Sequence, residues 1–234
     1  MSWTLATFTI LFLALSAGFG WYERSAPSTK VLALVATLAA LAAIGRVAFA
    51  PLPNIKPTTD IVLLSGYVLG GAPGFAVGAV SALASNLVFG QGPWTPFQMG
   101  AWGLCGIFGA LLAVLSRRRL SRWPLALCCG LAGLGFGAIM DFQTWVSLSG
   151  SHTLAQYGVI SGVSLSFNVA HAVGNVIFCL AFGPAFVRAL QRFRTRMSVR
   201  WEPVIAAPGV GARLPVAGVV AVLVGAGAAL AIAL

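Results

Sequence analysis

The side chains with the most evident binding chemistry in this sequence stand in one stretch of amides and tryptophans between two apolar runs. The stretch contains Asn86, Gln91, Trp94, Gln98 and Trp102, it has no charged residue, and two prolines stiffen its middle. Amide groups beside large aromatic surfaces suit the lining of a small-molecule pocket. The alternative is a tight turn between two membrane segments with tryptophans at the interface, and the stretch alone favours neither interpretation.

A second polar group lies in the proline-rich segment Pro51–Asp60, which offers Asn54, Thr58 and Thr59 as candidate binding residues. The apolar run that follows, Ile61–Leu69, is too short to cross a bilayer, for which about 20 residues are needed. Either this helix is short or the preceding loop dips into the membrane. Irregular backbone is tolerated there only where protein or water satisfies it, which favours a recessed polar cavity.

The third polar group is a stripe on one helix face, because Asn168, His171 and Asn175 are spaced i, i+3 and i+7. Polar side chains on a membrane helix are costly without partners, so we expect this stripe to face the protein interior. It could serve hydrogen bonding between helices, but we favour contact with a ligand for Asn168 and His171. Asp141 is a further candidate, at the start of the segment Asp141–Tyr157, which we expect to be an extracellular loop or a lid.

Composition shows which kind of elements must position these groups. The chain has 234 residues, of which 59% are hydrophobic and 8% charged, whereas soluble domains have about a quarter charged residues. We therefore expect an all-α integral membrane protein. Its net charge of +10 comes mostly from arginines in Ser116–Trp123 and Val187–Arg213, the pattern of cytoplasmic loops. Anionic lipid headgroups, rather than nucleic acid, are their expected partners.

The hydropathy pattern predicts about eight spans. Arg24 and Lys30 follow the first of them, which places the N-terminus outside. With both arginine-rich loops inside, the polar segments 51–60, 90–98 and 141–157 all fall on the outer side. The expected spans are Trp3–Phe19, Val31–Phe49, the short Ile61–Leu69, Phe75–Gly90, Met99–Leu115, Pro124–Met140, residues 158–186 and Leu214–Leu234.

The second span is rich in alanine, and two pairs, Ala36 with Ala40 and Ala39 with Ala43, are each four residues apart. Small residues one turn apart allow another helix to approach closely. The stripe can therefore dock a partner protein or pack inside this chain. Arg46, near the outer end of the span, is expected to snorkel to the headgroups, and contact with an anionic ligand group is the second interpretation.

The sequence lacks the motifs of several kinds of catalytic and metal sites. The sequence has no phosphate-loop motif and no HExxH motif, and its two histidines exclude a site with three histidine ligands. The four cysteines lie in apolar runs without zinc-ligand spacing, so we treat them as small hydrophobic residues. We expect no enzyme activity, no cofactor and no metal. A serine–histidine enzyme has no motif in its favour.

Three motifs resemble those of a known family. They are PNIKPTT at Pro53–Thr59, SNLVFGQGPWTPFQ at Ser85–Gln98 and FNVAHAVGN at Phe167–Asn175, which follow the alanine-rich helix in this order. Together they are similar to the S-components of energy-coupling factor (ECF) vitamin transporters, and most similar to the cobalamin-type branch. The resemblance covers Lys30 to about Arg194, so it implies a six-helix substrate-binding core in residues 30–194. Residues 1–29 and 195–234 would add one helix at each end.

The resemblance implies a receptor in the plasma membrane that captures a vitamin, cobalamin or a related corrinoid, on the outer face. It also implies docking to a transmembrane T-component with two ATP-binding subunits through the alanine stripe. A solitary secondary transporter with Arg46, Asp60, Asp141 and His171 as ion-coupled residues is the alternative. A membrane enzyme or assembly scaffold ranks below both, because no paired acid–base or metal motif occurs.

Overall fold

The computed structural model describes residues 3–196, which form seven α-helices and no strand. Six of these helices are long and apolar enough to cross a membrane, so the chain is an all-helical, multi-pass membrane protein. The predicted eighth span, Leu214–Leu234, lies outside the described residues. The helices are α1 (Trp3–Arg24), α2 (Thr29–Ala48), α3 (Thr58–Leu69), α4 (Gly71–Phe89), α5 (Trp94–Leu115), α6 (Arg122–Leu148) and α7 (Leu154–Arg196).

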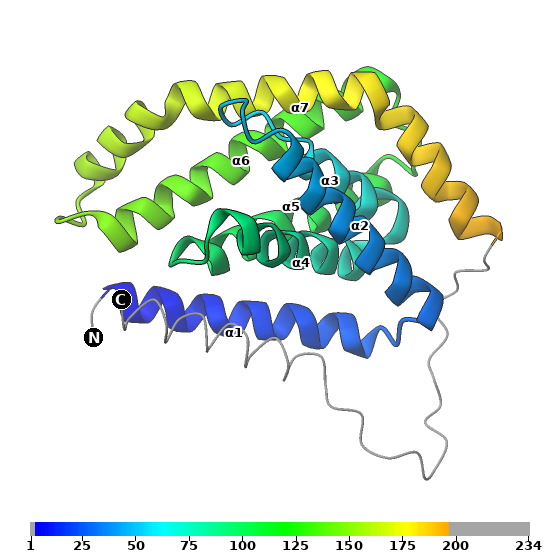
Figure 1. Cartoon of the computed structure of the whole chain (residues 1–234), viewed down its shortest axis with the longest axis horizontal. Coiled ribbons are helices and arrows are strands. Elements are labelled where there is room, and N and C mark those ends of the chain that lie inside the picture. Colours follow the sequence, from blue (N-terminus) through cyan, green and yellow to red (C-terminus); the bar gives the residue numbers. More distant parts are fainter. Residues whose placement is uncertain (1–2, 197–234) are drawn as a thin grey trace, which may run out of the picture.

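The helices surround the short helix α3, in which all 12 residues are buried. At about 1.5 Å per residue α3 is roughly 18 Å long, so it does not cross a bilayer, as the sequence predicts. Figure 1 shows α3, α4 and α5 in the middle of the molecule, with α1 along one side and α7 along the other. Helix α7 bends on its way to Arg196, and Pro184 lies inside it, where proline removes a helical hydrogen bond.

Glycines allow α3, α4 and α5 to cross with their backbones in contact. A Cβ atom on Gly66 would lie 1.8 Å from the carbonyl oxygen of Gly106, and one on Gly74 would lie 2.6 Å from the Cα of Gly66. No larger residue fits at these positions without moving a helix. We call Gly66, Gly74 and Gly106 the glycine crossing. It fixes the distances between α3, α4 and α5.

The C-terminal end of α3 is satisfied by arginines of the expected cytoplasmic side. Arg118 Nη1 donates hydrogen bonds to the carbonyl oxygens of Tyr67 (2.6 Å) and Val68 (2.8 Å), and Arg194 Nη1 donates a third, to Val68 (3.4 Å). A cation at a helix C-terminus also interacts favourably with the helix dipole. Partial burial, and then the charge of Arg194, lower the pKa of Arg118. These arginines therefore cap the C-terminal end of α3, in addition to indicating which end of the bundle is expected to face the cytoplasm.

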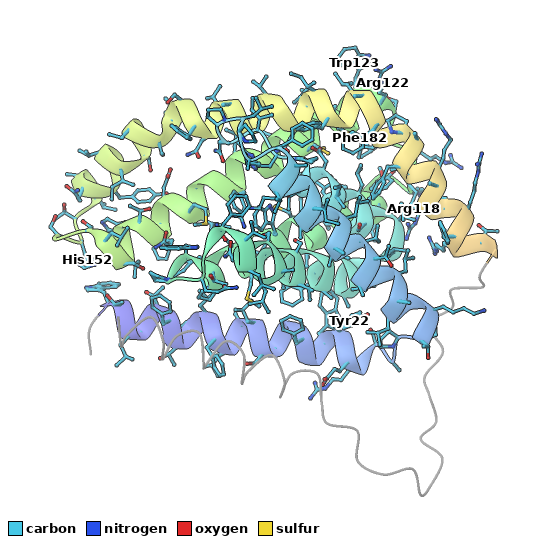
Figure 2. The ribbon with its side chains drawn as sticks, viewed as in Figure 1. Tyr22, Arg118, Arg122, Trp123, His152 and Phe182 are labelled. Carbon is cyan, nitrogen blue, oxygen red and sulfur yellow. The ribbon has the colours of Figure 1, made fainter. Side chains whose placement is uncertain are left out.

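Figure 2 shows the two ends of the bundle. Arg118 and Arg122 lie toward one end of the long axis, and His152 lies near the other end. By the positive-inside rule we expect the arginine end to face the cytoplasm and the loop of His152 to face outside. Tyr22, near the end of α1, lies on the arginine side, in agreement with an outside N-terminus.

Two predicted loops are shorter than the sequence indicates. Asp141–Tyr157 is not one loop: α6 continues to Leu148 and α7 begins at Leu154, so Asp141 is a helical residue. The expectation was wrong because Asp141 and Gln143 looked like loop residues, whereas both are buried between helices. The expected loop 90–98 likewise spans only four residues, 90–93, and α5 begins at Trp94. The basic segment from Val187 to Arg196, expected as part of a cytoplasmic loop, is the last part of α7.

Helix α1 packs on α4, α5 and α6 through one aromatic face. Phe19 meets Phe75 edge to face with ring centroids 5.4 Å apart, and Phe8 meets Phe97 in the same way at 5.5 Å. Gly18 leaves the space that the ring of Phe75 occupies. The additional N-terminal helix is therefore attached to the bundle on the side opposite α7 (Figure 1).

Candidate functional site

The first part of the site is a set of hydrogen bonds around Thr59, at the start of α3. Trp102 Nε1 donates to Thr59 Oγ1 at 3.1 Å, and Thr59 Oγ1 lies 3.0 Å from His171 Nε2. His171 Nδ1 lies 2.8 Å from the carbonyl oxygen of Asn54. The ring of Phe136 stacks on Trp102 with centroids 4.5 Å apart. We call these five residues the Thr59 cluster; they join α3, α5, α6, α7 and the loop before α3.

The hydrogen-bond partners in the Thr59 cluster determine which group donates and which accepts in each bond. The carbonyl of Asn54 can only accept, so the hydrogen of the neutral His171 imidazole is on Nδ1. Nε2 then accepts from the hydroxyl of Thr59, which itself accepts from the indole of Trp102. Each of these three donors, on Trp102, Thr59 and His171, therefore has an acceptor, as buried polar groups require. The cluster positions an imidazole and an indole rigidly, without a charge.

The second part of the site centres on Asn86, in the last turn of α4. Its side-chain oxygen accepts from Arg46 Nη1 (2.6 Å), and its side-chain nitrogen donates to Thr95 Oγ1 (3.0 Å) and to Gln98 Oε1 (2.8 Å). Ser85 Oγ accepts a second bond from Arg46 Nη1 at 2.7 Å. We call Arg46, Ser85, Asn86, Thr95 and Gln98 the Asn86 cluster. It links α2, α4 and α5.

The local sequence explains why these side chains face one another. Gly90 ends α4 with a φ of +90°, which favours glycine, and Pro93 directly precedes α5. The chain therefore reverses within four residues, so the last turn of α4 lies beside the first turns of α5. Asn86 is thereby placed opposite Thr95 and Gln98.

Arg46 joins the two clusters. Its guanidinium carbon lies 5.1 Å from the ring centre of Trp102 and 4.7 Å from that of Phe89, distances at which a cation is attracted to an aromatic face. The expectation that Arg46 snorkels to the headgroups is wrong, because its side chain points inward to Ser85 and Asn86, which are both buried. The outer halves of α2, α4 and α5 thus meet at one arginine, and Trp102 connects it to Thr59 of α3.

Some predicted binding residues have other contacts. Thr58 Oγ1 donates to the carbonyl of Ala42 (3.1 Å) and attaches α3 to α2. Gln91 is exposed and bonds the carbonyl of Leu83 and the hydroxyl of Thr95. The ring of Trp94 folds back over Gly92. Gln91 thus contacts the Asn86 cluster through Thr95, whereas within residues 3–196 neither Thr58 nor Trp94 has a side-chain hydrogen bond to either cluster.

Asp141 and Asn168 form a separate contact between α6 and α7. Asn168 Nδ2 donates to Asp141 Oδ2 at 3.0 Å and to Ser164 Oγ at 3.2 Å. Gly137 leaves room for this contact, since a Cβ there would lie 2.3 Å from Asn168 Oδ1. Of the predicted stripe, His171 and Asn175 are almost fully buried, so the stripe does face the interior. Only His171 reaches the Thr59 cluster.

Four members of the clusters were not among the predicted binding residues. Arg46 had been assigned to the headgroups, and Ser85, Thr95 and Phe136 had not been singled out. A signal existed for Ser85 and Thr95, because both stand next to predicted residues inside the motif Ser85–Gln98. Phe136 gave none, since one phenylalanine in an apolar helix resembles any other.

One group of described side chains could hold a metal ion. A carboxylate oxygen of Asp60 and the thiol sulfurs of Cys129 and Cys179 lie within 4.8 Å of one another, and all three residues are buried. Zinc takes such donors; the group is one protein ligand short of a structural zinc site, whereas catalytic sites have three protein ligands and a water. Spacing along the sequence could not reveal it, because the residues come from α3, α6 and α7. That the protein uses no metal stays a prediction.

The alanine stripe of α2 divides into two faces. Ala39 and Ala43 are buried, and α2 packs on α3 and α4, so this pair serves packing inside the chain. Ala36 and Ala40 are exposed. Of the predicted docking residues, only the exposed pair therefore presents a surface that another helix could approach.

Comparison with known proteins gives one distant likeness. The chain is 26% identical over 130 residues to a UPF0397 protein of Vibrio atlanticus (strain LGP32), a match that covers 49% of this chain and 71% of the Vibrio protein. No protein-family model matches the chain. No solved structure matches it either. What the chain binds is therefore inferred from its own residues.

Proposed function

We propose that this protein is the substrate-binding membrane subunit of an ECF-type importer. It captures a vitamin on the outer face and delivers it together with a T-component and two ATP-binding subunits. The observation that supports this proposal is the meeting of the Thr59 and Asn86 clusters at Arg46. Polar side chains from five helices and one main-chain carbonyl, that of Asn54, lie in these two clusters, although burying such groups in a membrane protein is costly.

The position of the clusters also supports a receptor. Thr59 lies at the start of α3, Asn86 at the end of α4 and Thr95 at the start of α5, so all three lie in the half opposite Arg118. A solute from outside reaches that half first. The ligand would contact groups that now bond to one another, chiefly Asn86, Gln98, Trp102 and His171. The motifs shared with S-components lie in the same segments.

The proposal includes partners because the sequence has no phosphate-loop motif with which to use ATP itself. The exposed pair Ala36 and Ala40 is the surface we propose for the T-component, since small residues permit close helix contact. The similarity to the cobalamin-type branch favours cobalamin or a related corrinoid as substrate. The rings of Trp102 and Phe89 beside Arg46, and the ring of Phe136 stacked on Trp102, suit a large ligand with apolar edges.

The test is to purify the protein in detergent from cells supplied with a vitamin mixture and to identify what is bound by visible spectrum and mass spectrometry. A corrinoid in a one-to-one ratio would support both the receptor and the branch. Another vitamin would retain the receptor and reject the branch. An empty protein that ignores a vitamin panel, and that never co-purifies with a T-component and ATPases, would overturn the proposal.

A solitary ion-coupled transporter is the second candidate, and the buried carboxyl group of Asp60 is the observation in its favour. Its proposed residues do not form a relay, however. Asp141 is bonded to Asn168, Asp60 lies beside two thiols, and Arg46 is bonded to Ser85 and Asn86. Proton-dependent uptake by the protein alone in liposomes, abolished by Asp60→Asn, would support this candidate over the receptor.

A further inference from the structure

The guanidinium of Arg46 uses only part of its hydrogen-bonding capacity. Both of its hydrogen bonds leave from Nη1, to Ser85 and Asn86. An arginine carries five N–H donors, so the three on Nε and Nη2 have no acceptor within residues 3–196. Neither Nε nor Nη2 is fully buried. One edge of the guanidinium is thus available to an acceptor that the described part of the chain does not supply.

The positive charge of Arg46 is not neutralised by a carboxylate of the described chain. The acidic residues within residues 3–196 are Glu23, Asp60 and Asp141. Glu23 is at the cytoplasmic end of α1, Asp60 lies beside Cys129 and Cys179, and Asp141 accepts from Asn168. The groups bonded to Arg46 are neutral. A half-buried cation without a counter-charge is costly in a membrane protein and signals a functional site.

A second cation nearby increases the local positive potential without competing for the same partner. Lys56 donates hydrogen bonds to the carbonyl oxygens of Phe49, Ala50 and Leu52, which uses all three donors of its ammonium group. Burial, and then the charge of Arg46, lower the pKa of Lys56, so the two cations interact. Lys56 holds its loop, whereas Arg46 keeps free donors.

Two aromatic rings restrict how a partner can reach Arg46. Trp102 and Phe89 lie against the guanidinium within 5.1 Å and 4.7 Å, and Nη1 is fixed on α4. The remaining edge, Nε with Nη2, presents two parallel N–H donors. That is the geometry with which arginine binds the two oxygens of a carboxylate or phosphate. Trp102 is only 2% exposed, whereas Phe89 is 40% exposed, so the ring of Phe89 is the one that can yield to an incoming ligand.

We propose that the Nε–Nη2 edge of Arg46 binds an oxyanion of the substrate, so that the substrate class is a vitamin or vitamin precursor with a free carboxylate or phosphate. This inference rests on the proposed function as a receptor. It adds that recognition depends on charge: the acid form binds and the corresponding amide or alcohol binds weakly. Among corrinoids it selects forms whose carboxylate or phosphate can reach Arg46.

The test uses matched pairs of probes that differ only in the anionic group. Nicotinate with nicotinamide, biotin with biotinamide, and cobyrinic acid with its fully amidated form test carboxylates; pyridoxamine phosphate with pyridoxamine tests phosphate. Binding to the purified full chain is measured by calorimetry and by quenching of tryptophan fluorescence. We expect at least one acid or phosphate to bind about tenfold to hundredfold more tightly than its neutral partner, the effect of a charge-assisted bidentate contact.

Variants separate the role of the edge from a role in folding. Arg46→Gln should lower the affinity for the anionic probe much more than the affinity for its neutral partner, so that the preference for the anion is lost. Arg46→Lys, which keeps the charge but not the paired donors, should retain an intermediate preference. The control is Arg122→Gln, an exposed cation on the other side of the molecule (Figure 2), which should change nothing.

The outcomes distinguish the inference from the function on which it rests. A vitamin that binds equally well in charged and neutral forms, with no change in Arg46→Gln, would overturn the oxyanion site and leave the receptor intact. If no probe binds and no vitamin co-purifies, both are rejected. If Arg46→Gln does not yield folded protein, Arg46→Lys decides, because an unchanged preference for the acid over the amide would reject the paired-donor geometry.

Discussion

The two halves of the α3–α4–α5 core are packed by opposite means. In the outer half, the helices meet through polar side chains, those of the Thr59 and Asn86 clusters that Arg46 joins. In the inner half, the same helices meet at the glycine crossing, where backbone touches backbone. Side-chain contacts can exchange one partner for a ligand, whereas backbone contacts cannot. The outer half is therefore suited to binding and the inner half to holding the helices in place.

We expect the largest loss of stability from adding a side chain at the glycine crossing. In Gly106→Leu the new Cβ would lie 2.2 Å from the carbonyl oxygen of Gly74, a backbone atom that cannot move alone. Overpacking costs about 1–3 kcal/mol even where side chains yield, and we expect more here. The readout is the fraction of monodisperse protein in detergent and its unfolding temperature. Gly135→Leu is the control, since nothing lies within 4 Å of its Cβ; equal losses in both variants would reject the crossing.

The next test removes the hydroxyl at the centre of the outer half. Thr59→Val leaves the indole of Trp102 and Nε2 of His171 without their partner, which should cost about 1–3 kcal/mol of stability and weaken ligand binding. Thr58→Val is the matched control, because its hydroxyl bonds only the carbonyl of Ala42. It should lower the unfolding temperature slightly and leave binding unchanged. Loss of binding in Thr58→Val would show that both threonines act through folding.

The sequence predicts the two halves unequally well. The order of the helices followed from hydropathy, and the polar residues of the outer half stood out because amides and a histidine are rare in membrane spans. Thr59, Asn86, Gln98 and His171 were all among the predicted residues and do lie in the clusters. The glycine crossing was not predicted, since a chain with 28 glycines does not show which of them touch.

Errors in the prediction have physical causes. Asp141 was placed in a loop because a carboxylate usually marks solvent, but here Asn168 satisfies it between two helices. Arg46 was assigned to the headgroups because its inward partners, Ser85 and Asn86, are about 40 positions away in the sequence. The environments of Asp141 and Arg46 both depend on which helices are neighbours. The periodicity of the sequence does not show that arrangement.

A smaller effect should separate the members of the outer half from an exposed residue outside it. Asn86→Ala and Gln98→Ala should each weaken ligand binding by about 1–3 kcal/mol, because each leaves a buried polar group unpaired. Gln191→Ala, at an exposed glutamine in the last part of α7, should have little effect. Affinities can be measured with the vitamin that co-purifies with the wild-type protein. Wild-type affinity in both buried variants would exclude Asn86 and Gln98 from the site.

The smallest effect on the chain itself is expected on the exposed face of α2, which belongs to neither half. Ala40→Trp adds a large ring where the side chain is exposed, so stability should change by less than about 0.5 kcal/mol and ligand affinity should not change. If this face docks the T-component, the ring blocks the close helix approach and co-purification of the complex is lost. Ala39→Trp, one position earlier but only 1% exposed, should instead prevent folding. A complex that survives Ala40→Trp would show that α2 contributes alanines to this chain's packing alone, and the docking surface would have to lie on another helix.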